Sequence, residues 1–160
     1  MQVNEIILIL IGQIRSKENS IMSRNLACAN IDFCLCDGLG VNHQCDWEVI
    51  LSIWDKESCS LEEKKYDLTG LTGYGTVKAK AGDDDPIANI KVEIQRENQI
   101  VLSMSKEETS KIPVDGDKWF KVSRYQYDVI LEGDGKRMRV LEGIIEVSPS
   151  VTDNNDKENA

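Results

Sequence analysis

Alternation of apolar and polar residues at every second position is the feature that most constrains how this chain folds. Residues 90–94 alternate Ile, Val and Ile with Lys and Glu, and residues 125–131 place Tyr, Tyr, Val and Leu at every other position. Residues 47–53 place Trp, Val, Leu and Ile on one side of an extended backbone. A period of two is typical of antiparallel strands that bury one face. The chain is therefore expected to be all-β.

Turn-forming residues separate these alternating segments. Gly and Asp cluster at 38–40, 70–75, 82–86, 115–117 and 133–135, where they favour tight turns. The segments between them predict about seven strands, at 26–36, 45–54, 72–80, 89–96, 99–104, 124–132 and 137–147. Strands of this number and spacing predict an antiparallel β-sandwich. A short helix is expected at Ser105–Lys111, with Ser105 as its N-cap.

The pattern divides the chain into an N-terminal apolar arm (1–22), a β-sandwich domain (23–148) and a polar acidic tail (149–160). The arm carries a run of aliphatic residues, Ile6, Ile7, Leu8, Ile9, Leu10 and Ile11. Such a run needs burial, either as a strand of the domain or against a partner chain. A third interpretation makes Met22 the natural start. The run is far shorter than the roughly 20 residues that cross a bilayer.

The charge balance narrows the classes of partner. The chain has 160 residues, with 19 Lys and Arg against 28 Asp and Glu, for a formal net charge of −9. An acidic surface disfavours nucleic acid, because binding to phosphates needs basic groups. It equally disfavours an anionic membrane surface. With one histidine and no recognisable catalytic signature, the protein is not expected to be an enzyme.

The cysteines raise the question of a metal site. Five are present, an odd number that favours reduced, partly buried thiols over a disulfide framework. Cys34, Cys36, His43 and Cys45 together offer four zinc ligands, although a Cys-x-Cys spacing on a strand differs from the usual Cys-x-x-Cys. The pattern favours small buried residues, with His43 in a loop and no cofactor. A zinc- or thiol-dependent enzyme built on these four residues is the alternative.

A family resemblance covers about two thirds of the chain. Asp46-Trp-Glu-Val49 opens a strand, and Leu68-Thr-Gly70 precedes the middle strands. Tyr127-Asp-Val129 then leads into a last segment, Gly143-Ile-Ile-Glu-Val-Ser-Pro-Ser-Val-Thr152. This order resembles the small immunoglobulin-like or jelly-roll-like β domains of tailed-bacteriophage virion proteins. Domains of that type attach fibres or receptor-binding proteins to the tail and baseplate.

The resemblance implies a non-enzymatic virion structural protein, made in the host cytoplasm and assembled in the tail or baseplate region. It would act as an adaptor for fibres or neighbouring tail proteins and form a homo-oligomer, with no nucleic acid or membrane partner. A head decoration protein that stabilises the capsid is the alternative. The interface residues expected are the arm residues Ile6 to Ile11, with Trp54 and Trp119 as outer anchors.

Overall fold

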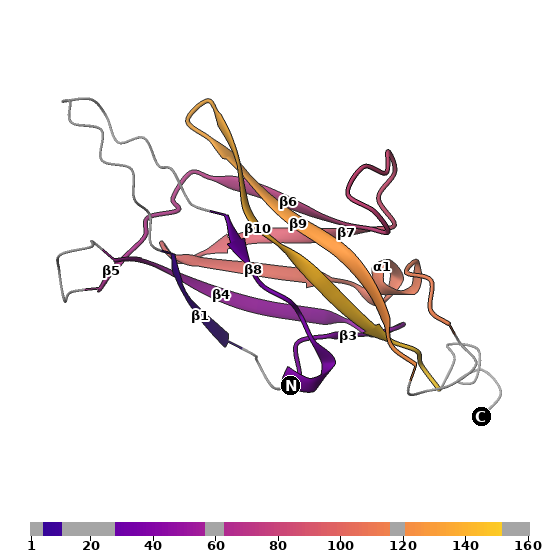
Figure 1. Cartoon of the computed structure of the whole chain (residues 1–160). Coiled ribbons are helices and arrows are strands. Elements are labelled where there is room, and N and C mark those ends of the chain that lie inside the picture. The colour runs from indigo at the N-terminus through magenta and orange to yellow at the C-terminus, as the bar shows by residue number, and fades with distance from the viewer. Residues whose placement is uncertain (1–4, 11–27, 57–62, 116–120, 152–160) are drawn as a thin grey trace.

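A computed structural model describes residues 5–10, 28–56, 63–115 and 121–151 (Figure 1). The strands are β1 (Glu5–Leu10), β2 (Ala29–Asn30), β3 (Val41–Asn42), β4 (Trp47–Lys56), β5 (Glu63–Lys65), β6 (Thr72–Lys78), β7 (Ala88–Gln95), β8 (Gln99–Met104), β9 (Ser123–Gly133) and β10 (Lys136–Ser148). A 3-10 helix, η1 (Leu35–Asp37), and a short α-helix, α1 (Lys106–Ser110), complete the described elements.

The strands form one continuous mixed sheet in the order β1-β4-β8-β7-β6-β9-β10-β2. The ladders from β4 through to β10 are antiparallel, whereas β1, β2 and β3 pair in parallel with their neighbours. The prediction of an all-β fold is therefore confirmed. The six longer strands begin and end within two residues of the predicted bounds, because each buries one face of an alternating segment.

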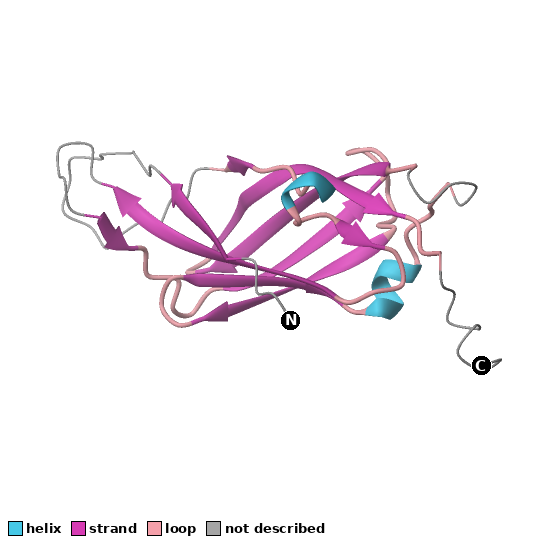
Figure 2. Cartoon of the chain, turned by 90° about the horizontal axis from the view of Figure 1, so that it is seen from below, coloured by secondary structure: helices cyan, strands magenta, loops and turns pink. Residues whose placement is uncertain are grey.

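The sheet curls into a half-barrel, so that strands face one another across the core (Figure 2). The predicted β-sandwich would consist of two separate sheets, and the series of paired strands would then be interrupted between them. Instead β6 pairs with β7 on one side and with β9 on the other. Gly73 lies in β6, where a Cβ would come within 2.6 Å of the Leu131 side chain and 2.7 Å of the Val92 side chain. A glycine there leaves room for side chains of both neighbouring strands to converge on the inner face.

The N-terminal part of the domain differs most from the prediction. Over 28–36, the described part of the strand predicted at 26–36, the chain makes the two-residue β2, a single bridge from Phe33 to Ile145, and then η1. Backbone bonds from Ile31 and Phe33 still follow β10, but the polypeptide turns at Cys34. The short strands β3 and β5 fall outside the predicted set, since two or three residues are too few to show a period.

Residues 29–42, which we call the closing segment, cover the core of the half-barrel. The ring of Phe33 is fully buried and lies between Trp47 of β4, with 5.3 Å between ring centroids, and Tyr127 of β9, at 4.9 Å. The Trp47 indole donates a hydrogen bond to the Leu39 carbonyl at 2.9 Å, and the Tyr127 hydroxyl donates to the Ile31 carbonyl at 2.7 Å. The closing segment therefore joins two strands that are far apart in the sheet order.

Close backbone contact holds the closing segment against β10. A Cβ on Gly143 would lie 2.1 Å from the Ile31 carbonyl oxygen, closer than any side chain allows. The Asp32 carboxylate also accepts a hydrogen bond from the Ile144 amide at 2.9 Å. Glycine at 143 is therefore required for this approach.

The expected turns at 38–40, 82–86 and 133–135 and the expected helix are found. Of the other two expected turns, 70–75 continues into β6, and residues 116–117 lie outside the described residues. Asp134 and Gly135 both have positive φ, which a two-residue hairpin between β9 and β10 requires. Ser105 caps α1 by accepting a hydrogen bond from the Glu108 amide at 3.3 Å, as predicted. In the part of the chain that the structure describes, no helix is long and apolar enough to span a membrane.

We predict that Phe33→Ala strongly destabilises the fold. Removing a fully buried ring from between Trp47 and Tyr127 leaves a cavity, which costs about 3–5 kcal/mol of unfolding free energy. Urea unfolding followed by tryptophan fluorescence measures this loss. Tyr74→Ala is the matched control, because that ring is 42% exposed on the outer face and its loss should cost less than about 1 kcal/mol. Equal losses in both variants would contradict the role assigned to Phe33.

Candidate functional site

The apolar run of the arm forms a strand at one edge of the sheet. β1 pairs in parallel with β4 over its whole length, from Glu5 opposite Ile50 to Leu10 opposite Asp55 (Figure 1). On its other side β4 is bonded to β8 and, further along, to β5. Among the described residues, β1 is thus the strand that covers this edge of β4. Without it, a row of β4 amides and carbonyls would lose its partners.

Trp54 lies near the end of the β1–β4 ladder. It is opposite Ile9 of β1 and Lys65 of β5, and its side chain is half-buried. Its indole N–H is buried and finds no acceptor among the described residues. The role of Trp54 as an outer anchor of an interface stays a prediction. Ile6 to Leu10 lie within β1, whereas Ile11 and Trp119 lie outside the described residues.

A groove of about 490 Å³ crosses the outer face of β6, β9 and β10. Its lining includes Tyr74, Thr76 and Lys78 of β6, Gln126, Asp128 and Ile130 of β9, and Arg137, Arg139, Glu142 and Ile144 of β10. Sequence reasoning missed this groove, although the alternation contained a signal for part of it: positions 74, 76 and 78 fall on one face of their strand, as do 126, 128 and 130. What gathers these residues is the pairing of β6 with β9 and of β9 with β10.

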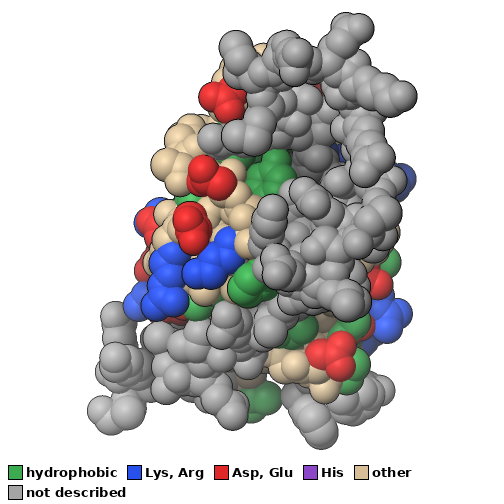
Figure 3. Space-filling model, turned by 90° about the vertical axis from the view of Figure 1, so that its left-hand side faces the viewer, with side chains coloured by type: hydrophobic (Ala, Val, Ile, Leu, Met, Phe, Trp, Pro, Cys, Tyr) green, Lys and Arg blue, Asp and Glu red, His purple; other side chains and the backbone are tan. Residues whose placement is uncertain are grey.

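Aromatic, apolar and charged groups lie side by side in the groove. Tyr74 is 42% exposed and Ile144 is 40% exposed. Arg137 donates a hydrogen bond from Nε to the Tyr74 hydroxyl at 3.0 Å and lies 3.5 Å from a Glu132 carboxylate oxygen. Figure 3 views the side of the molecule where β5 lies in Figure 1, and shows basic side chains beside acidic ones on the described surface. The Arg137 guanidinium also lies over the Tyr74 ring, 6.0 Å from the ring centroid.

The structure brings together two of the four candidate zinc ligands. The thiols of Cys34 and Cys36 lie with the Asp37 carboxylate in one cluster, in which all three ligand atoms are within 4.8 Å of one another. The His43 ring nitrogen Nε2 instead lies 3.3 Å from the Ser110 carbonyl, and neither His43 nor Cys45 belongs to the cluster.

The expectation of partly buried thiols is met only at Cys34, which is half-buried. Cys28, Cys36 and Cys45 are free thiols on the surface, and Cys59 lies outside the described residues. The difference has a local cause at Cys36, because η1 replaces the predicted strand there and contains no buried residue.

Glu146 of β10 connects the cluster to the sheet. Its carboxylate accepts hydrogen bonds from the Leu35 amide at 3.1 Å and from the Arg124 Nε at 2.9 Å. Burial acts to raise the pKa of this carboxyl, but the bonds from Arg124 and Leu35 outweigh it and lower the pKa below its usual value. The pKa of Tyr127 is raised well above its usual range, mainly by burial and secondly by nearby negative charges such as that of Asp32. The Tyr127 hydroxyl therefore stays protonated and donates its hydrogen bond to the closing segment.

No protein-family model matches the chain, and no curated protein matches it.

We predict that the stabilising effect of Glu146 is lost in acid. A carboxyl whose pKa is lowered in the folded state adds stability above its unfolded pKa of about 4.3, and this stability disappears as the pH falls through the folded pKa. The difference in unfolding free energy between wild type and Glu146→Gln should be largest above about pH 5 and shrink below about pH 4. Arg124→Ala, which removes the partner, should show the same narrowing in chemical denaturation between pH 3 and pH 7. A constant difference across this range would contradict the assignment.

Proposed function

We propose that the protein is a non-enzymatic structural protein of a tailed-bacteriophage virion, assembled in the tail or baseplate region as an adaptor for fibres or neighbouring tail proteins. The observation that carries the proposal is β1, an apolar N-terminal strand that adds to the sheet edge in parallel. The assignment to an immunoglobulin-like or jelly-roll-like module belongs to the same proposal. It is supported by a curled sheet that encloses its core between facing strands.

In this proposal β1 is the part that subunits exchange. The β4 edge of a neighbouring copy offers the same backbone groups in the same register as the chain's own β4. Residues 11–28 join β1 to β2, and an extended segment of that length spans at most about 60 Å. Burying the five aliphatic side chains of β1 contributes on the order of 10 kcal/mol of gross apolar transfer, part of which offsets the ordering of the arm. Head-to-tail exchange of this kind forms a ring when the rotation between neighbouring subunits closes, which is the arrangement proposed here.

An adaptor also needs a surface for a second protein, and the groove on β6, β9 and β10 supplies a candidate. It lies on strands at the other end of the sheet order from β1. Tyr74 and Arg137 are residue types that dominate the binding energy of protein interfaces. The exposed Ile144 adds apolar area beside them. The two surfaces together allow one subunit to bind its own copies and a different partner at once.

We predict that assembly depends on β1. Full-length protein should form a defined oligomer by light scattering coupled to size exclusion, and the variant that begins at Met22 should be monomeric, because it lacks the exchanged strand. Leu8→Pro is the second variant, since proline removes a backbone donor from the middle of β1. Val122→Ala, at an exposed position away from β1, is the control and should assemble like wild type.

Circular dichroism of each variant separates loss of assembly from loss of folding. If the folded Met22 variant still assembles, or if full-length protein is monomeric at all concentrations, strand exchange is refuted.

A further prediction concerns the partner. Protein added to purified tails and to purified capsids of the phage that encodes it should bind tails with saturable stoichiometry and leave capsids bare. The double variant Tyr74→Ala, Arg137→Ala should bind tails at least about tenfold more weakly, because two residues of hot-spot type are lost. Val122→Ala, at an exposed position outside the groove, is again the control. Saturable binding to capsids alone would replace the adaptor by a head decoration protein.

A further inference from the structure

The turn that follows Phe33 is held rigidly by its own backbone. The Cys34 carbonyl accepts hydrogen bonds from the amides of Asp37 at 3.3 Å, Leu39 at 3.1 Å and Gly40 at 2.9 Å. Gly38 has a φ of +73° and ends η1 in the left-handed conformation. A Cβ on Gly40 would lie 2.6 Å from the Leu35 side chain, so the turn also packs closely on itself. These contacts define the positions of the Cα and Cβ atoms from which the side chains of the turn extend.

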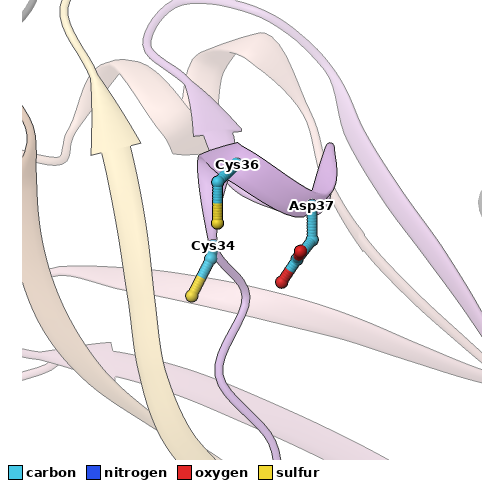
Figure 4. Close-up of side chains that lie close together, drawn as sticks. All are labelled: Cys34, Cys36 and Asp37. Atoms are coloured by element: carbon cyan, nitrogen blue, oxygen red, sulfur yellow. The ribbon is translucent and has the colours of Figure 1, made fainter.

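Three of these side chains converge. Figure 4 shows that the thiols of Cys34 and Cys36 and the carboxylate of Asp37 all extend from the same side of the turn. Their ligand atoms lie within 4.8 Å of one another. Two thiolates bound to one tetrahedral zinc ion at about 2.3 Å are roughly 3.8 Å apart, so rotation of these exposed side chains is enough to close a site. The spacing thus suits one ion.

The surroundings of the cluster are acidic. The carboxylates of Glu146, Asp32 and Asp37 are close enough to the Cys34 thiol to act on it electrostatically. These negative charges attract a divalent cation, whose charge compensates for them. The Glu146 carboxylate is itself positioned by hydrogen bonds from Arg124 and from the Leu35 amide, so its negative charge stays beside the site.

We propose that Cys34, Cys36 and Asp37 bind one thiophilic divalent ion of the zinc class, with water completing its coordination. Two sulfur ligands select for such an ion over Mg²⁺ or Ca²⁺, which take oxygen ligands. The site differs from the four-residue set suggested by the sequence, because His43 and Cys45 contribute nothing to it. It is also independent of strand exchange, since all three ligands lie in the closing segment.

Metal binding should stabilise the closing segment. All three ligands lie within four residues between the Phe33 bridge and β3, so an ion bound there ties the turn into one unit. Amide hydrogen exchange at 34–40 should slow when zinc is added to the reduced protein. Exchange in α1, which holds no ligand of this site, should stay unchanged.

The test is titration of the reduced full-length protein with Co²⁺, followed by displacement with Zn²⁺. We expect one equivalent of Co²⁺ to bind and to give a thiolate-to-cobalt charge-transfer absorption, which Zn²⁺ abolishes. Cys34→Ser, Cys36→Ser and Asp37→Asn should each weaken binding by more than about tenfold, since even outer-shell changes cost at least that much. Cys45→Ser and His43→Ala are the matched controls and should bind like wild type.

Thermal unfolding without metal shows whether each variant is folded, and Cys36 and Asp37 are exposed enough for their substitutions to be tolerated. The proposal is overturned if wild type binds no stoichiometric Co²⁺, or if folded Cys36→Ser binds Co²⁺ as tightly as wild type. It is equally overturned if Cys45→Ser or His43→Ala loses the absorption, because the ion would then be held elsewhere.

Discussion

The packing of one ring, Phe33, against two others holds the curled sheet closed. Trp47 belongs to β4 and Tyr127 to β9, which are four places apart in the sheet order, and no backbone ladder joins them. Phe33 touches both, and the polar ends of both rings donate hydrogen bonds to carbonyls of the closing segment. Apolar burial and hydrogen bonding act together here, since each ring is satisfied at its polar end and buried at its apolar face. These three rings belong to the same hydrophobic core as the other buried side chains of the sheet.

The closing segment also explains why unrelated features lie near one another. It leaves β10 at Phe33, makes the turn that carries Cys34 and Cys36, and returns to β10 through β3. Glu146 of β10 accepts a hydrogen bond from the turn. β10 therefore contributes an acidic side chain next to the proposed metal site and buried side chains to the core. A substitution in the turn is therefore expected to alter the packing of the core as well.

The edges of the sheet are treated differently. The outer edge of β10 pairs in parallel with the short strands β2 and β3. β4 is covered by β1, which is separated from β2 by a long stretch of sequence. An edge covered by an apolar strand that belongs to a distant part of the chain is open to exchange between copies, because the backbone bonds are the same in either arrangement. This physical equivalence underlies the proposed assembly.

Local information was enough for the long strands and their inner faces. The face of β4 that carries Trp47, Val49, Leu51 and Ile53 is buried, and β8 spans the predicted 99–104, because alternation and turns are encoded within a few residues. The same reasoning failed at 26–36. There the backbone follows contacts with β10 more than a hundred residues away, which no local pattern records.

The sequence by itself determined that the chain is all-β, where its long strands and one helix lie, and that its aliphatic arm needs burial. Only the tertiary structure decided that the strands join one curled sheet, that β1 pairs with β4, and that Cys34 and Cys36 meet Asp37 but not His43. It alone joined the outer faces of β6, β9 and β10 into a groove. The physical reason is separation along the chain. Periodicity arises from neighbouring residues, whereas ladders, grooves and ligand clusters arise from residues brought together by folding.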